Sequence, residues 1–258
     1  MNRDSLDFLL PMFPFAHFSQ FNILVINQTI PDVILQSDYA SVRVINSFDK
    51  GLSKSRNLAL DNSKQRLCII ADDDVVYEPD FEQSIVTAYD QNPEVPLIGF
   101  RVKTPDGGLF KKYPQETVIA NSFQRLNIMS IEMVVNSEVC GTVRFNENFG
   151  LGAKFPLGEE AIFINELHKR KLPIITEPVT IVAHPEISSN DRVTTEEKYY
   201  VQGALFTALF GSRYFKWLFL KLIFDVKQNK LKSGQIRSAL KSAARGRKDL
   251  LSINEDNN

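Results

Sequence analysis

Three consecutive carboxylates, Asp72, Asp73 and Asp74, follow a short apolar run from Leu67 to Ala71. A run of this length that ends in charge is typical of a buried strand in a mostly parallel sheet. In such sheets ligands bind beyond the carboxyl ends of the strands, where these acids would lie. Hard divalent cations such as Mg²⁺ or Mn²⁺ prefer carboxylate oxygens and keep positions open for phosphate. The alternative is a solvated acidic turn ahead of the helix that begins near Pro79.

Three other local patterns carry side chains that could act together with these acids. Arg56 and Asn57 lie near the start of a predicted helix, where free backbone N–H groups and the guanidinium favour an anion. Glu159 and Glu160 also start a helix, and either carboxylate could remove a proton from a hydroxyl group. His184 follows a predicted strand and could bind a metal. Each pattern also has a structural interpretation: a solvated arginine, acids that complement a helix dipole, and a packed histidine.

Alternating strands and helices supply the framework for these groups. The apolar runs predict strands at 21–27, 41–46, 67–71, 95–101, 131–136, 173–177 and 179–183. Other patterns predict helices at 51–60, 79–90, 159–170 and 194–210, the last one after a capping box at Thr194 and Glu197. This order predicts an α/β fold: a single Rossmann-like domain with a mostly parallel mixed sheet and helices on both faces.

Composition is that of an ordinary globular protein. The 258 residues are 43% hydrophobic and 24% charged, which is enough for one substantial core. No apolar stretch approaches the ~20 residues of a membrane-spanning helix, and Met1 to Asp4 lacks the character of a signal peptide. Cys68 and Cys140 are expected to be buried and reduced. We therefore expect a cytoplasmic protein.

The segment after residue 210 differs from the rest of the chain, and we predict a domain at 1–210 followed by a basic, amphipathic helical tail at 211–258. Its residues 215–224 are aromatic and apolar, with lysines between them. Between residues 213 and 249, only Asp225 and Asp249 oppose the basic residues Arg213, Lys216, Lys221, Lys227, Lys230, Lys232, Arg237, Lys241, Arg245, Arg247 and Lys248. Such a tail can lie on an anionic membrane surface, or it can pack on the core with a solvated basic face. No nucleic-acid recognition motif accompanies the charge, so we expect no nucleic-acid partner.

Together, these motifs resemble those of the family-2 glycosyltransferases, which are inverting enzymes of the GT-A fold. The resemblance extends from about Asn2 to Ser189. The motifs that carry it are Gly51-x-Ser-x-Ser-Arg-Asn57, the Asp-x-Asp pair at 72 and 74, and Phe149-Gly-Leu-Gly-Ala153 leading to Gly158-Glu-Glu160.

The resemblance implies a donor side built on the acids. Asp72 and Asp74 would hold Mn²⁺ or Mg²⁺ together with the ribose or diphosphate of a nucleotide-sugar donor. Asp73 is adjacent and would belong to the same donor site. Arg56 and Asn57 would lie near the nucleotide.

The resemblance also implies the remaining roles. His184 would be a further metal ligand. Glu160 would be the catalytic base, with Glu159 as the other candidate. Gly150 and Gly152 lie in the loop that would shape the acceptor pocket. The expected reaction is transfer of a sugar to an acceptor hydroxyl with inversion. The basic tail would place the enzyme at the inner membrane face, where lipid-linked glycans are found. The expected acceptor is therefore a glycan or lipid-linked glycan, in cell-surface polysaccharide or lipopolysaccharide synthesis.

One departure from the family concerns its first strand, which has the form Val-Ser-Ile-Ile-Ile-Pro-Thr-Tyr-Asn-Arg. Met1-Asn2-Arg3 matches only its last residues, so the first strand is expected to be missing. Either the start of the sequence is mis-assigned or truncated, or the protein lacks a central strand. Loss of a central strand would leave neighbouring backbone groups unpaired and lower stability or activity. Two other functions stay open: a non-catalytic binding protein on a degenerate transferase fold, and a metal-dependent nucleotidyltransferase.

Overall fold

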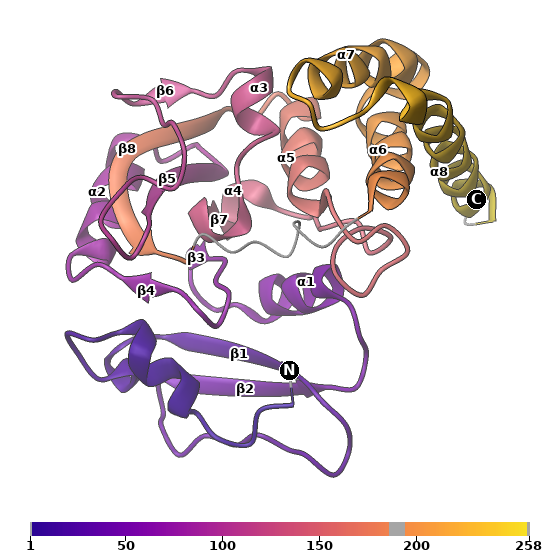
Figure 1. The fold of residues 1–258 in the computed structure, drawn as a ribbon. Helices are drawn as coiled ribbons and strands as arrows, with labels where there is room; N and C mark the ends of the chain where they lie inside the picture. The colour runs from indigo at the N-terminus through magenta and orange to yellow at the C-terminus, as the bar shows by residue number, and fades with distance from the viewer. Residues whose placement is uncertain (1, 186–193, 257–258) are drawn as a thin grey trace. The chain divides into compact units, whose positions relative to one another are not determined.

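The computed structural model describes residues 2–185 and 194–256. The chain forms two compact units (Figure 1). The sheet unit comprises Met1–Asn148 and Glu159–Glu186, and the helical unit comprises Phe149–Gly158 and Ile187–Asn258. Nearly all of the motifs that could carry chemistry therefore fall in the sheet unit, and only the glycine-rich loop at 149–158 falls in the helical unit.

The larger sheet of the sheet unit has the strand order β3-β7-β5-β8-β4, with β6 paired to β8. Its strands are β3 (Leu67–Ile69), β4 (Val76–Tyr77), β5 (Leu97–Lys103), β6 (Val118–Ile119), β7 (Met133–Asn136) and β8 (Ile174–Ala183). The sheet is mixed, as predicted, but the expectation that it is mostly parallel was wrong. Only β5 and β8 pair in parallel, because β7 runs antiparallel between β3 and β5.

The two strands predicted at 173–177 and 179–183 form the single strand β8, which passes through Pro178. Proline removes one donor from a ladder, so it is tolerated inside a strand at an irregularity. The register between β5 and β8 shifts at this point, where Gly99 pairs with Thr176 and Arg101 pairs with Thr180. The proline therefore bends the strand without ending it.

The strands β1 (Ile23–Gln28) and β2 (Val42–Ser47) form a separate parallel pair, so the single sheet that we expected is two sheets. Among the described strands, β1 pairs only with β2, and β3 pairs only with β7. The backbone N–H of Asn2 donates to the carbonyl of Gln28 at 2.9 Å, and the N–H of Arg3 donates to Asn27 Oδ1 at 3.1 Å. Asn2 and Arg3 are thus bonded to the end of β1.

Helices cover both faces of the larger sheet, as predicted. Tyr89 on α2 donates its hydroxyl to the carbonyl of Val134 on one face at 2.6 Å. On the other face, Val135 packs in one apolar cluster with Phe163 of α5. The helical segments of this unit are α1 (Leu52–Asn62), α2 (Phe81–Gln91), α3 (Ser122–Arg125), α4 (Ser137–Cys140), α5 (Glu159–Lys169) and the 3₁₀ turns η1 (Asp7–Met12), η2 (Phe18–Gln20) and η3 (Ser130–Glu132).

The helical unit contains α6 (Thr195–Phe210), α7 (Tyr214–Lys227), α8 (Ile236–Asp256) and the short turns η5 (Gly211–Arg213) and η6 (Ser233–Gln235). The predicted capping box begins α6: Thr194 accepts from the N–H of Glu197, and the Glu197 carboxylate accepts from the N–H of Thr194. At Gly203 the backbones of α6 and α8 approach so closely that a Cβ would meet the carbonyl of Ala243. Because α6 packs with the later helices, the compact units do not coincide with the predicted division at residue 210.

Two further observations concern the chain as a whole. Within the described residues, no helix is both long enough and apolar enough to cross a membrane. Cys68 and Cys140 are both free thiols; Cys140 is buried, whereas Cys68 is only half-buried.

Candidate active site

Three elements of the sheet unit deliver the candidate residues. Helix α1 begins at Gly51, whose φ of 130° lies in a region that favours glycine, and it carries Arg56 inward. The three aspartates follow β3 and precede β4. Helix α5 begins directly at Glu159, so Glu159 and Glu160 occupy its first turn, where the helix dipole favours carboxylates.

Arg56 is the centre of the site. Its Nη1 donates to Glu159 Oε1 at 3.0 Å and to Glu160 Oε1 at 3.2 Å. Its Nη2 lies 3.7 Å from Asp72 Oδ1. The guanidinium carbon stands 5.4 Å from the centre of the Phe145 ring, a distance typical of a cation–π contact. The structure therefore brings together Arg56, Asp72, Glu159 and Glu160, four residues that the sequence assigned to one site.

Negative charge exceeds positive charge in this cluster. Burial raises the pKa of Glu159 to about 7; the neighbouring Glu160 adds to the shift, and Arg56 opposes it. Burial also raises the pKa of Asp72, with Arg56 again opposing and Asp74 and Glu160 reinforcing the rise. One guanidinium thus faces three carboxylates. This is an arrangement in which a cation or a proton from a substrate would be stabilised.

The two glutamates differ in exposure. The side chain of Glu159 is 6% exposed and is bonded to Arg56, whereas the side chain of Glu160 is 22% exposed. A general base must reach the proton of an incoming hydroxyl group. Glu160 meets this requirement better than Glu159, which is enclosed and holds the guanidinium in place.

Asp74 and His184 form a second group. The Nε2 of His184 lies 3.3 Å from Asp74 Oδ1, and the backbone N–H of His184 donates to the carbonyl of Lys103 at 2.9 Å. The ring packs edge-on against Phe110, and its Nδ1 is buried without a hydrogen-bond partner. The ring is therefore held by packing and by its backbone, and its Nε2 is directed at a carboxylate.

Whether this pair fits a metal depends on the other donors. In the part of the chain that the structure describes, no three His, Cys, Asp or Glu side chains gather closely enough to hold a metal ion. Magnesium-type sites, however, often use one or two carboxylates and take the other ligands from water and substrate phosphates. Asp74 with His184 fits this arrangement.

Asp73 takes a different partner from its two neighbours. Its carboxylate forms an ion pair with Arg3, where the Nη2–Oδ2 distance is 2.5 Å, and the Arg3 guanidinium stacks on the Phe8 ring at 4.9 Å. Sequence reasoning missed Arg3 as a partner of the acids. No local pattern could have revealed it, because the two residues are 70 positions apart.

Asn57 is buried, and its side chain is bonded to Phe145 and Glu147 rather than to the carboxylates around Arg56. Its side-chain Nδ2 donates to the carbonyl of Phe145 at 2.9 Å and to Glu147 Oε1 at 3.1 Å, and its Oδ1 accepts from the N–H of Phe145 at 2.7 Å. These bonds fix Phe145, which also stacks on Phe163 at 4.3 Å. The structure thus gives Asn57 a supporting contact with the aromatic ring under Arg56. Phe145 is a site residue that the sequence reasoning did not single out.

Gly150 and Gly152 lie in the loop Phe149–Gly158 of the helical unit. Their φ angles of 102° and 82° are readily adopted only by glycine, so the loop requires both residues for its path. Phe149 and Phe155 close the loop on themselves, with ring centres 4.9 Å apart. The role of this loop in acceptor binding stays a prediction.

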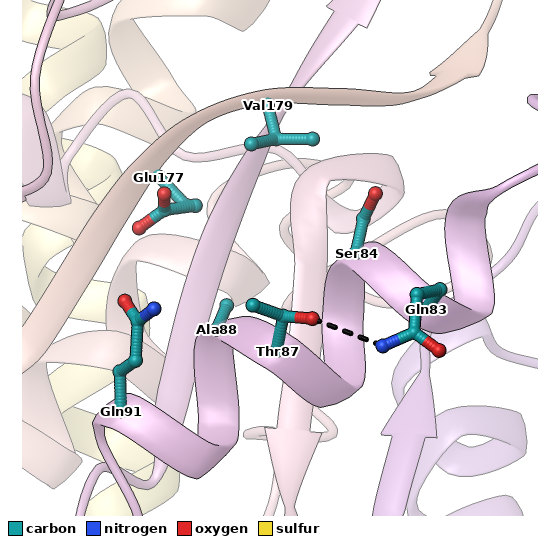
Figure 2. Close-up of a pocket in the computed structure, with 7 residues that line it drawn as sticks. All are labelled: Gln83, Ser84, Thr87, Ala88, Gln91, Glu177 and Val179. Atoms are coloured by element: carbon teal, nitrogen blue, oxygen red, sulfur yellow. Dashed lines mark hydrogen bonds between the residues drawn. The ribbon is translucent and has the colours of Figure 1, made fainter.

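Two hollows on the surface lie elsewhere. Figure 2 shows one of about 230 Å³ between α2 and β8, lined by Gln83, Ser84, Thr87, Ala88, Gln91, Glu177 and Val179. Gln83 donates to Thr87 across its wall at 3.1 Å. Another, of about 280 Å³, is lined by residues of η1 and η2 and of the segment 36–39. Neither is lined by Asp72, Asp73, Asp74, the α5 glutamates or His184.

The chain is also similar to known proteins. Residues 21–150 match the family described as Glycosyl transferase family 2. No curated protein sequence matches the chain. Among solved structures, S. aureus TarS 1-349 is similar, with 15% identity and a TM-score of 0.59 over 94% of this chain and 76% of that one.

The same protein is also similar in its complex with UDP (15% identity, TM-score 0.58, 94% of this chain and 76% of that one). Its complex with UDP-GlcNAc gives 13% identity and a TM-score of 0.59 over 92% of this chain and 74% of that one. Identities this low show the fold, which is GT-A-like with a mixed sheet and C-terminal helices. Because the family match spans half of the sequence and includes α1 and the three aspartates, the chain belongs to glycosyl transferase family 2.

Proposed function

We propose that this protein transfers a sugar from a nucleotide-diphosphate donor to a hydroxyl group of a glycan or lipid-linked glycan, with inversion at the transferred sugar. The observation that carries this proposal is the cluster in which Arg56 joins both α5 glutamates to the first aspartate of the Asp-x-Asp motif. Structures of the similar protein TarS with UDP and UDP-GlcNAc support a donor of the same chemical class.

On the donor side, Asp72, Asp74 and His184 are the proposed ligands of Mn²⁺ or Mg²⁺; Asp74 and His184 lie 3.3 Å apart, whereas Asp72 is shared with Arg56. When bound, such an ion neutralises the charge that develops on a leaving diphosphate. Arg56 keeps Asp72 oriented and places a fixed positive charge beside it, so this part of the site needs little rearrangement during the reaction. Asp73, paired with Arg3, lies in the same motif, and we keep it as a donor-side residue.

On the acceptor side, Glu160 removes the proton of the attacking hydroxyl group. Glu159 is a positioning residue, because it binds the same Arg56 Nη1 as Glu160. The positive charge of the guanidinium is therefore shared between the two glutamates, and Glu160 keeps part of its negative charge uncompensated. Attack from the face opposite the diphosphate gives inversion. Gly150 and Gly152 belong to the loop that we propose for acceptor binding.

The acceptor class suggests where the enzyme works. We propose a role in cell-surface polysaccharide or lipopolysaccharide synthesis at the cytoplasmic face of the membrane, where lipid-linked glycans are extended. The basic residues of the helical unit support this location.

Glu160→Gln tests the proposal, with release of nucleoside diphosphate from UDP-sugars as the measurement. The variant should lose about 10²–10⁴-fold in turnover and keep the thermal shift produced by donor with Mn²⁺. Glu166→Gln is the matched control, since Glu166 is an exposed acid on the same helix, paired with Lys169.

Full turnover in Glu160→Gln would exclude the assigned base. Release of inorganic diphosphate by the wild-type protein would indicate nucleotidyl transfer. Donor binding without turnover in any condition would indicate the binding protein on a degenerate fold.

A further inference from the structure

The outward side of α7 is apolar although it faces solvent. Five of its large side chains are between 39% and 63% exposed, and we call them the α7 face: Phe215, Phe219, Leu220, Ile223 and Phe224. At 3.6 residues per turn, positions 215, 219 and 223 form one stripe and positions 220 and 224 form a second beside it. The face is therefore continuous along most of the helix.

The opposite side of α7 fixes the rotation of the helix. Leu218 and Leu222 pack in the core of the helical unit, together with residues of α6 and α8. Asp225 is completely buried there. Its carboxylate accepts from Lys221 Nζ at 2.5 Å and from Lys198 Nζ and Tyr199 Oη, both at 2.9 Å.

Turning the α7 face inward would break this network. It would also leave a buried carboxylate without partners, at a large cost in stability. Burial of Asp225 thus ensures that the aromatic residues stay outside.

Positive charge accompanies the α7 face. Lys216 and Lys227 are exposed and project from the same side of the helix as its aromatic residues, whereas the only acid of α7 is the buried Asp225. Arg247 of α8 places its guanidinium 4.5 Å from the Tyr214 ring and 5.5 Å from the Phe215 ring, at the start of the face. Lysine and arginine side chains can extend from an apolar layer to a charged one.

We propose that the α7 face binds an anionic lipid surface, with α7 lying in the plane of the interface. Aromatic and aliphatic side chains would enter the head-group boundary, and Lys216, Lys227 and Arg247 would meet the lipid phosphates. This inference deepens the proposed location of the enzyme. It rests on the geometry of the helical unit, so lipid binding and sugar transfer can fail independently.

Other occupants fit this face less well. A second copy of the chain would present the same lysines, and a face without acids gives them no partner. A nucleic acid would match the charge but would leave five apolar side chains in water. A bilayer surface supplies both an apolar layer and negative charge. The helix has 14 residues, about 21 Å at 1.5 Å each, which is too short to span a bilayer.

The test is co-sedimentation of the full chain with vesicles of phosphatidylcholine, alone or with phosphatidylglycerol. The protein should bind the anionic vesicles, and binding should weaken as salt is raised. The double variant Phe219→Ser/Phe224→Ser should lower the partition coefficient by about tenfold or more. Lys216→Gln/Lys227→Gln should lower it by about fivefold for each lysine.

Controls distinguish binding through the α7 face from nonspecific hydrophobic adsorption. Phe123→Ser removes an aromatic side chain that is 69% exposed in the sheet unit, and it should bind vesicles like the wild type. Because the substituted α7 residues are exposed, their variants should keep the wild-type circular dichroism spectrum and melting temperature. Equal binding to neutral and anionic vesicles would overturn the proposal, and so would unchanged binding of the double Phe variant. A wild-type protein that forms a stable dimer and does not bind vesicles would also overturn it, if the double Phe variant is monomeric.

Discussion

Replacing Arg56 by methionine removes the charge at the centre of the site and keeps most of the side-chain volume. The Glu159 carboxylate then loses its bond to Nη1, 3.0 Å long, while its side chain stays 6% exposed. A buried charge that loses its partner costs about 3–5 kcal/mol. In a chain of this size, each kcal/mol lowers the melting temperature by about 2–4 °C, so we expect a loss of about 6–20 °C at alkaline pH.

The loss should depend on pH because Glu159 titrates. Its pKa is raised from 4.5 in the unfolded chain to about 7 in the folded protein. A raised folded-state pKa means that the protonated form favours folding. This contribution to stability is complete below pH 4.5 and is lost as the pH rises through 7.

Without Arg56 the pKa of Glu159 rises further, since the guanidinium is the charge that opposes the shift. The deficit of Arg56→Met relative to the wild type should therefore be large at about pH 8.5 and small at about pH 5.5.

Thermal melts of wild type and variant at the two pH values measure this difference. Arg144→Met is the control, because Arg144 and Asp61 form an ion pair at the surface. Such a pair contributes about 0–1 kcal/mol. A deficit of the same size at both pH values, or one no larger than that of the control, would refute the assigned electrostatics of the cluster.

Two further outcomes are expected. Asp74→Asn should abolish the part of the UDP-induced rise in melting temperature that requires Mn²⁺, and a rise that persists in full would remove Asp74 and His184 from the metal site. Gly203→Ala should lower the free energy of unfolding in urea by about 1–3 kcal/mol or more, because the new Cβ would meet the carbonyl of Ala243 and push α6 from α8. Gly234→Ala is its control and should be neutral, since a Cβ there would have no neighbour within 4 Å.

The local surroundings of these site residues could be predicted from sequence because each depends on a short segment of the chain. The local sequence determines the start of α1 at a glycine, the strand before Asp72 and the first turn of α5 with its two acids. Their order along an α/β chain then suggested that they meet. The contacts of Arg56 with Asp72, Glu159 and Glu160 agree with that reasoning.

Features that depend on contacts between distant segments could not be predicted in this way. The apolar pattern of β7 does not show that it runs antiparallel between two other strands, because the direction of pairing is decided by backbone bonds to β3 and β5. The resemblance placed Asn57 near the nucleotide, and only the folded chain shows its bonds to Phe145. Arg3 and Asp73 meet for the same non-local reason.

The free side of β1 has a consequence for how the protein is handled. Among the described residues, Asn2 donates a backbone hydrogen bond to Gln28, at the end of the strand, and β2 is the only described strand that pairs with β1. The strand contains the run Ile23-Leu-Val-Ile26, and an apolar strand with unpaired N–H and C=O groups is a template for strands of other chains. Concentrated solutions therefore have a route to irreversible aggregation that starts in the sheet unit and does not require unfolding of the core.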